Sequence, residues 1–228
     1  ELGLTPLAGL NTNERVYFVR HAEAHPNNQF ENGNYVCRGQ WRALGAPAIL
    51  YRKITADTGG RRPHNFAVYG PDPSYPVGVH RNSYVRAALT VEPFAIAYGL
   101  PMHLANGVDW NEWNTGESAA IRFFFMHEAV AGANAGFSNA TLLIGWEHFN
   151  IGQMVKDLLD NYYRPARPDN SAQLPVWNGN DYDTIWIVSL DANGNLAFTN
   201  DCEGVPSATL PTSCPTFSNN PARTPQAP

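Results

Sequence analysis

Residues 16–27, with the sequence VYFVRHAEAHPN, place chemically active side chains directly after an apolar run. The apolar run stops at Arg20, and His21, Glu23 and His25 follow within five residues. Two chemistries fit a cation, two imidazoles and a carboxylate at the end of a strand. Either His21 and His25 ligate a metal ion, or Arg20 and His21 form an anion site that contains a nucleophile.

The order of the residues favours the anion site. A helical metal motif of the H-E-x-x-H kind has Glu directly after the first His, whereas this segment reads H-A-E-A-H. Pro26 disfavours helical geometry at His25, and the preceding residues have the composition of a strand. Arg donates two parallel hydrogen bonds to a phosphate, and a neutral imidazole is a competent nucleophile toward phosphorus. We therefore expect neither a metal ion nor a cofactor here.

Short apolar strands alternate with helical segments along the chain. Buried strands are predicted at 15–19, 66–69, 102–104, 141–146 and 184–190. The spacing of apolar residues predicts helices at 39–54, 83–98, 118–130 and 151–163. Gly45 and Pro47 should break the first of these helices, and Pro93 should kink or restart the second. A turn after the last strand predicts a hairpin to 196–199. The alternation predicts an α/β fold, a three-layer α/β/α sandwich with a mostly parallel central sheet.

Two of the predicted strands are followed by ionisable side chains. Arg20 and His21 follow the strand at 15–19, and Glu147 and His148 follow the strand at 141–146. Ligands of parallel sheets bind beyond the carboxyl ends of the strands. We therefore expect the two histidines to face a common crevice.

Several segments of the chain resemble the motifs of the histidine phosphatase superfamily, the phosphoglycerate-mutase-like group, and they occur in the same order as in that family. RHA at 20–22 resembles the R-H-G/A signature, and Asn27 stands six residues after the histidine, where the family often has Asn. NSYVRAALT at 82–90 is similar to the S-x-x-x-R-A-x-x-T segment, with Asn in the place of Ser. LLIGWEH at 142–148 resembles the strand that delivers the second catalytic histidine. The ordered set spans residues 15–199.

The resemblance implies a role for each matching residue. His21 would attack phosphorus and become a phosphohistidine, which water would then discharge. Arg20, Arg86 and His148 would hold the phosphoryl oxygens and stabilise the charge of the transition state. Asn27 would add a hydrogen bond. The implied function is a phosphomonoesterase that acts on a small-molecule phosphoester or another anionic substrate.

The sequence departs from the family at the acid that protonates the leaving oxygen. One branch of the family has Glu in an L-x-E context after a central strand, and Asn106 stands in that place here. Another branch has Asp directly after the second histidine, and Phe149 follows it here. Glu147 precedes that histidine and is the first candidate, with Glu112 and Asp109 of a Trp-rich loop behind it.

A second function therefore stands beside the phosphatase. A divergent member of the superfamily would keep the anion pocket but bind a ligand or carry out non-phosphatase acid–base chemistry. Asn106 at the expected acid position favours this alternative. The set of Arg20, His21, Arg86 and His148 favours the phosphatase.

Charge and hydropathy argue against two kinds of partner. The net charge of −5 over 228 residues is unlike that of a nucleic-acid-binding surface, which is normally basic. No apolar stretch approaches the length needed to cross a bilayer. We expect neither a nucleic-acid partner nor a membrane partner.

The cysteines, one sequon and the first residue predict a secreted protein. Cys202 and Cys214 lie in a tail rich in Pro, Ser and Thr, and we predict a disulfide between them that leaves Cys37 unpaired. Residues 139–141 read N-A-T, a glycosylation sequon, and the chain begins at Glu1 rather than Met. The phosphatase-like domain would cover residues 1–200, and residues 201–228 would form a tail packed on it or extending from it.

Overall fold

The computed structural model describes residues 10–26, 29–74, 76–105, 119–126, 136–160 and 174–215. Within them, one sheet has the strand order β5-β2-β6-β1-β7-β8. Its strands are β1 (Glu14–Arg20), β2 (Phe66–Pro71), β5 (Met102–Ala105), β6 (Thr141–Trp146), β7 (Thr184–Leu190) and β8 (Leu196–Cys202). β5, β2, β6 and β1 are parallel, whereas β7 is antiparallel to both of its neighbours. The predicted strands and the predicted β7–β8 hairpin are confirmed.

The helices of the described residues agree with the prediction in place but not in every boundary. They are α1 (Cys37–Gly45), α2 (Pro47–Thr55), α3 (Arg86–Ala97), α4 (Ala119–Phe125) and α5 (His148–Leu158). The expected break lies between α1 and α2, and Pro47 stands in the first turn of α2, where its missing N–H costs nothing. α3 begins later than predicted, because β4 (Asn82–Ser83) pairs instead with β3 (Pro76–Val77). Among the described helices, none has both the length and the apolar character of a membrane span.

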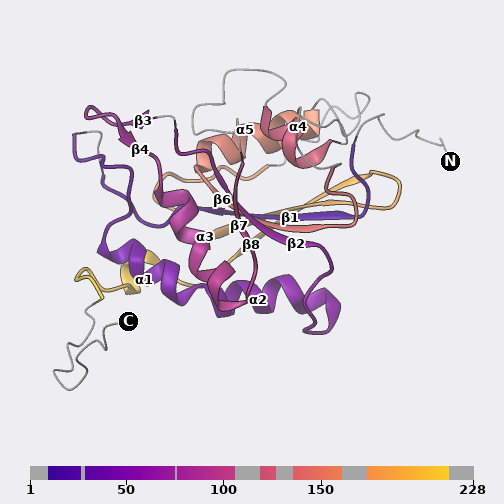
Figure 1. Ribbon diagram of the computed structural model, residues 1–228, viewed down its shortest axis with the longest axis horizontal. Coiled ribbons are helices and arrows are strands. Elements are labelled where there is room, and N and C mark those ends of the chain that lie inside the picture. The colour runs from indigo at the N-terminus through magenta and orange to yellow at the C-terminus, as the bar shows by residue number, and fades with distance from the viewer. Residues whose placement is uncertain are drawn as a thin grey trace, which may run out of the picture.

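The sheet is the middle layer of the fold. α4 and α5 cover one face, and α1, α2 and α3 cover the other (Figure 1). Successive side chains of a strand point to opposite faces. Accordingly, Val16 and Phe18 of β1 belong to the core under α4 and α5, whereas Tyr17 and Val19 belong to the core under α2 and α3. The predicted three-layer α/β/α sandwich is confirmed.

β1 and β6 lie side by side and end at the same level. Arg20, the last residue of β1, pairs with Trp146, the last residue of β6. The chain leaves β1 toward α1 on one face and leaves β6 toward α5 on the other (Figure 1). Where neighbouring parallel strands send the chain to opposite faces, a crevice forms at their carboxyl ends, and ligands of α/β sheets bind there.

The predicted disulfide between Cys202 and Cys214 was wrong. Cys214 is bonded to Cys37 at the start of α1, and Cys202 is a free, exposed thiol at the end of β8. After β8 the chain turns back along α1, and the Trp41 indole N–H donates to the backbone oxygen of Ser213 at 2.7 Å. The prediction used only the short sequence separation between Cys202 and Cys214. The folded chain instead brings together two cysteines that are 177 residues apart in the sequence.

The described part of the predicted tail packs against α1. The Ser207 hydroxyl donates to Glu23 at 2.6 Å, and Arg42 of α1 donates to the backbone oxygen of Val205 at 2.7 Å. The domain boundary at residue 200 stays a prediction.

Candidate active site

Five of the predicted site residues meet at the carboxyl ends of β1 and β6. Nε2 of His21 lies 2.8 Å from Oε2 of Glu147. Nε of Arg20 and Nη2 of Arg86 each lie 3.8 Å from a carboxylate oxygen of Glu147, and Nδ1 of His148 contacts the same carboxylate. The side chain of Glu147 is 12% exposed, and the other four are less exposed still. The cluster is a buried arrangement of two guanidinium groups, two imidazoles and one carboxylate.

Three other predicted site residues lie outside the described part of the chain. They are Asn27, Asp109 and Glu112, and the family's acid position at Asn106 lies outside it as well. Their roles stay predictions. Phe149, which follows the second histidine, is described and 70% exposed.

Backbone hydrogen bonds fix the ring of His21. Its own N–H donates to the backbone oxygen of Trp146 at 2.8 Å, which continues the β1–β6 ladder by one residue. Its Nδ1 lies 2.7 Å from the backbone oxygen of Ala22. The N–H of Ala22 in turn donates to the hydroxyl of Thr90 on α3 at 2.8 Å. Nδ1 is thus tied to the backbone, and Nε2 is the ring nitrogen that faces Glu147.

A tight turn at Gly33 positions Arg86 at the start of α3. The backbone oxygen of Gly33 accepts hydrogen bonds from the N–H groups of Val85 and Arg86 at 3.0 and 2.9 Å. Gly33 has a φ of +78°, and a Cβ built there would stand 1.7 Å from the backbone oxygen of Ser83. Only glycine fits. Glu31 of the same loop forms an ion pair with the Arg86 guanidinium and accepts from the N–H of Gly33 at 2.7 Å.

The segment before β7 holds Arg20, and the sequence reasoning missed it. Nη1 of Arg20 donates to the backbone oxygens of Gly179 and Asp181 at 2.6 and 3.3 Å. Its guanidinium carbon lies 4.0 Å from the centroid of the Tyr182 ring, a cation–π contact. The segment reaches the site because β7 is antiparallel to β1, so β7 begins at the edge where β1 ends. To predict this contact, one would need to know that β7 runs antiparallel to β1. The residue pattern of a strand does not reveal its direction.

The charges of the cluster shift the acidities of its members. Burial acts to raise the pKa of Glu147, but the adjacent His21, the hydrogen bonds from both histidines and the charge of Arg20 hold it well below its ordinary value of 4.5. Burial lowers the pKa of His21 from its ordinary 6.5, and the Glu147 carboxylate opposes that shift. Glu147 is therefore an ionised carboxylate in this arrangement.

Two donors of the cluster lack hydrogen bonds to the described residues. Nε of Arg20 and Nε of Arg86 are both buried without such a partner. A buried donor left unpaired costs about 1–3 kcal/mol. The cluster can therefore accept more anionic oxygens than the carboxylate of Glu147 supplies.

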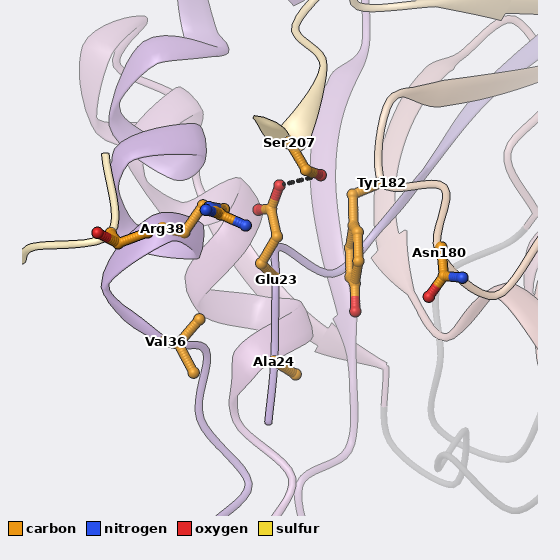
Figure 2. A pocket seen from close by; sticks show the side chains of 8 residues that line it. Glu23, Ala24, Val36, Arg38, Asn180, Tyr182 and Ser207 are labelled. Atoms are coloured by element: carbon orange, nitrogen blue, oxygen red, sulfur yellow. Dashed lines mark hydrogen bonds between the residues drawn. The ribbon is translucent and has the colours of Figure 1, made fainter. Parts of the chain in front are cut away.

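A cavity of about 440 Å³ is lined by none of the five cluster residues and is connected to them through Tyr182. Tyr182 belongs to its lining, and the ring centroid of Tyr182 lies 5.9 Å from that of His21. In Figure 2, Arg38 and Tyr182 stand on either side of Glu23, which is hydrogen-bonded to Ser207. The other lining residues are Ala24, Val36, Asn180 and Thr212.

Glu23 of the cavity lining is held by Arg42, which joins carboxylates from three parts of the chain. Its guanidinium donates to Glu23 at 2.8 Å and to Glu203 at 2.7 Å, and Nη1 lies 3.7 Å from Asp183. Burial and, to a smaller extent, the neighbouring carboxylates raise the pKa of Glu203 to about 7 against the attraction of Arg42. The hydrogen bonds from Arg42 and Ser207 overcome burial at Glu23 and lower its pKa. The ion pairs of Arg42 hold Glu23 and therefore fix the backbone just beyond His21.

Among the described residues, no group of three or more His, Cys, Asp or Glu side chains is arranged to hold a metal ion.

Comparison with known proteins gives a likeness of fold. No family model matches the sequence, and no curated protein matches it. One similar solved structure is a protein assigned as the phosphohistidine phosphatase SixA of Nakamurella multipartitia, with 13% identity and a TM-score of 0.45 over 86% of this chain and 99% of that one. Another is a mycobacterial glucosyl-3-phosphoglycerate phosphatase with inorganic phosphate, with 12% identity and a TM-score of 0.43 over 85% of this chain and 98% of that one.

Proposed function

We propose that the protein is a phosphomonoesterase that acts through a phosphohistidine at His21. One observation carries the proposal: Nε2 of His21 faces an anionic group that lies among Arg20, Arg86 and His148. A phosphoryl group in that place would have the imidazole in line to attack it and guanidinium groups to neutralise its charge.

The expected reaction has two steps. Nε2 of His21 attacks phosphorus, the bond to the leaving oxygen breaks, and an acid protonates that oxygen. Water then attacks the phosphohistidine and releases inorganic phosphate. Glu147 is the described candidate for the acid, and Glu112 and Asp109 remain candidates from the sequence. The cavity that contains Arg38 and Tyr182 is the proposed site for the leaving group, and a small-molecule phosphoester is the proposed substrate class.

A screen of phosphoesters with phosphate release as readout tests this function. His21→Ala should reduce turnover by roughly 10⁴-fold or more, because it removes the proposed nucleophile. His64→Ala, at an exposed histidine far from the cluster in sequence, is the matched control and should retain full activity. A His21→Ala protein that still hydrolyses the substrates would end the phosphohistidine mechanism.

A second function has one observation in its favour. The carboxylate of Glu147 already lies among the groups that would bind a phosphoryl group. A divergent protein that binds a carboxylated or phosphorylated ligand without turnover would also use this pocket. Binding of such a ligand with no hydrolysis of any phosphoester would favour it.

We also propose that the protein is a secreted glycoprotein. The Cys37–Cys214 disulfide is of the kind that persists in oxidising compartments. Asn139 of the sequon is exposed at the start of β6, at the opposite end of the strand from Glu147 and His148, so a glycan there would leave the cluster accessible.

A further inference from the structure

Arg38 brings a positive charge into the cavity beside Tyr182. Arg38 is the second residue of α1, it is partly buried, and it belongs to the cavity lining. Its Nε is buried without a hydrogen-bond partner, and its guanidinium forms no ion pair with any of the described residues. A buried donor without a partner costs free energy that a suitable ligand would recover. The guanidinium is therefore placed to bind an anionic group from outside the chain.

The carboxylate in the same lining does not neutralise Arg38. That carboxylate is Glu23, and its Oε1 accepts from Nη2 of Arg42 at 2.8 Å and from the hydroxyl of Ser207 at 2.6 Å. Its Oε2 accepts from Nε of Arg42 at 3.1 Å. The charge of Glu23 is thus already opposed by Arg42, and the charge of Arg38 is left for a ligand.

The start of α1 adds to the positive potential of the cavity. Val36 is the N-cap residue of α1 and lines the cavity together with Arg38. The apolar side chain of Val36 makes no capping hydrogen bond, and the first turn of α1 contains no acidic residue. The N-terminus of a helix carries about half a unit of positive charge. This helix end supports the guanidinium in attracting an anion.

The tail forms the opposite wall and is tied to α1. The disulfide joins Cys37, the first residue of α1, to Cys214. The Trp41 indole N–H donates to the backbone oxygen of Ser213 at 2.7 Å. Thr212, which directly precedes these two tail residues, lines the cavity. A cavity whose walls are held in this way binds a ligand with little loss of conformational freedom in the protein.

Tyr182 connects the cavity to the proposed nucleophile. Its ring centroid lies 5.9 Å from that of His21 and 4.0 Å from the guanidinium carbon of Arg20. The same residue lines the cavity, and in Figure 2 it stands on the opposite side of Glu23 from Arg38. A phosphoester with its phosphoryl group at His21 would therefore extend its leaving group past Tyr182 toward Arg38.

The charges of the lining favour a singly charged acidic group. Arg38 contributes one positive charge, and a guanidinium donates two parallel hydrogen bonds to a carboxylate. The carboxylate of Glu23 in the same lining would repel the second negative charge of a phosphoryl dianion. The amide of Asn180 and the hydroxyl of Thr212 offer neutral hydrogen bonds to the same ligand. A carboxylate matches this set of groups.

We propose that Arg38 is a specificity-determining residue that binds a carboxylate on the leaving group, in the cavity between α1 and the tail. This proposal rests on the phosphomonoesterase function above and names its substrate class, the phosphoesters whose leaving group carries a carboxylate. Binding energy gained at Arg38, away from phosphorus, favours these phosphoesters over neutral ones of the same size.

Phosphonate analogues test the site without turnover. Alkylphosphonates of increasing chain length are compared in pairs, one with a terminal carboxylate and one with the neutral amide of the same size. In calorimetry, the carboxylate of the best-fitting length should bind roughly tenfold to a hundredfold more tightly than its amide, because hydrogen bonds to charged groups are of that strength. Equal affinities at every length would overturn the proposal. Tighter binding of a terminal second phosphonate than of the carboxylate would overturn the choice of a carboxylate.

Variants of Arg38 show whether this residue makes the distinction. Arg38→Gln should lower the ratio of the two affinities by roughly tenfold to a hundredfold, and Arg38→Lys, which keeps the charge, should retain part of the ratio. Arg52→Gln, at an exposed position on α2, is the matched control and should keep the full ratio. An unchanged ratio in Arg38→Gln would show that the carboxylate does not contact Arg38. The comparison in the unmutated protein decides the existence of the site even if Arg38→Gln does not fold.

Hydrolysis separates this proposal from the function on which it rests. The kcat/KM of the unmutated protein for carboxyalkyl phosphates should exceed that for the matching amides by roughly tenfold to a hundredfold, and Arg38→Gln should lose this preference. If the protein hydrolyses acids and amides equally well, the function stands and this inference fails. If it hydrolyses no phosphoester, the function fails, and a preference for the carboxylated phosphonate that depends on Arg38 would still establish the carboxylate site.

Discussion

Replacing Glu203 with Gln should change how the stability of the protein depends on pH. Glu203 is buried beside Arg42, which also holds Glu23, and its pKa is raised from 4.5 to about 7. Between these values the unfolded chain ionises while the folded protein keeps the proton, so stability falls as the pH rises through this window. At about 1.4 kcal/mol per pKa unit, the cost of ionising Glu203 in the fold reaches about 3 kcal/mol at pH 8. Gln at this position cannot ionise and escapes that cost.

The quantity to measure is the difference in unfolding free energy between Glu203→Gln and the unmutated protein. Urea denaturation at a series of pH values from 4.5 to 8 gives it directly. The difference should shift by about 3 kcal/mol in favour of Glu203→Gln across the series, whatever its value at the acid end. Glu92→Gln, at an exposed position, should show no such trend. A flat difference for Glu203→Gln would refute the reasoning, because it would mean that Arg42 stabilises the Glu203 carboxylate enough to cancel the cost of burial.

Two further predictions concern the framework of the site. In the native, non-reduced protein a thiol reagent should label Cys202 alone, and reduction should release two more thiols. Peptide mapping that finds Cys37 or Cys214 labelled before reduction would contradict the disulfide. The same peptide maps report whether Asn139 carries a glycan. Gly145→Ala should lower the unfolding free energy by roughly 1–3 kcal/mol, because its Cβ would stand 2.7 Å from the backbone oxygen of Ala87. Gly152→Ala, at an uncrowded helical position, should instead raise it by roughly 0.5–1 kcal/mol in the same denaturation experiment, and equal effects at both glycines would rule out the packing argument.

The sheet was predictable because its signals are local. Runs of β-branched and aromatic residues mark β1, β6 and β7, and the Gly45–Pro47 pair marks the break between α1 and α2. Ionisable residues directly after β1 and β6 then indicated a common edge. These inferences needed only the periodicity of the chain and the rule that parallel strands end at one edge of a sheet.

What the sequence did not reveal depends on contacts between distant segments. Cys37 and Cys214 meet because the chain after β8 turns back along α1, and Arg42 reaches Glu203 for the same reason. The contact of Tyr182 with Arg20 depends on β7 running antiparallel to β1. Periodicity describes one segment at a time and contains no information on these pairings.

The position of Glu147 follows from the register of two strands. Arg20 pairs with Trp146, so the next pair along is His21 opposite Glu147. A slip of one residue would place a histidine or a tryptophan opposite His21 instead. Gly145 lies directly under α3, where a larger side chain would collide with the backbone at Ala87, the neighbour of Arg86. The close approach of α3 at Gly145 therefore brings the start of α3, and with it Arg86, close to the end of β6. The sequence already placed Glu147 at this edge of the sheet, and the register of β1 and β6 is what sets it directly opposite His21.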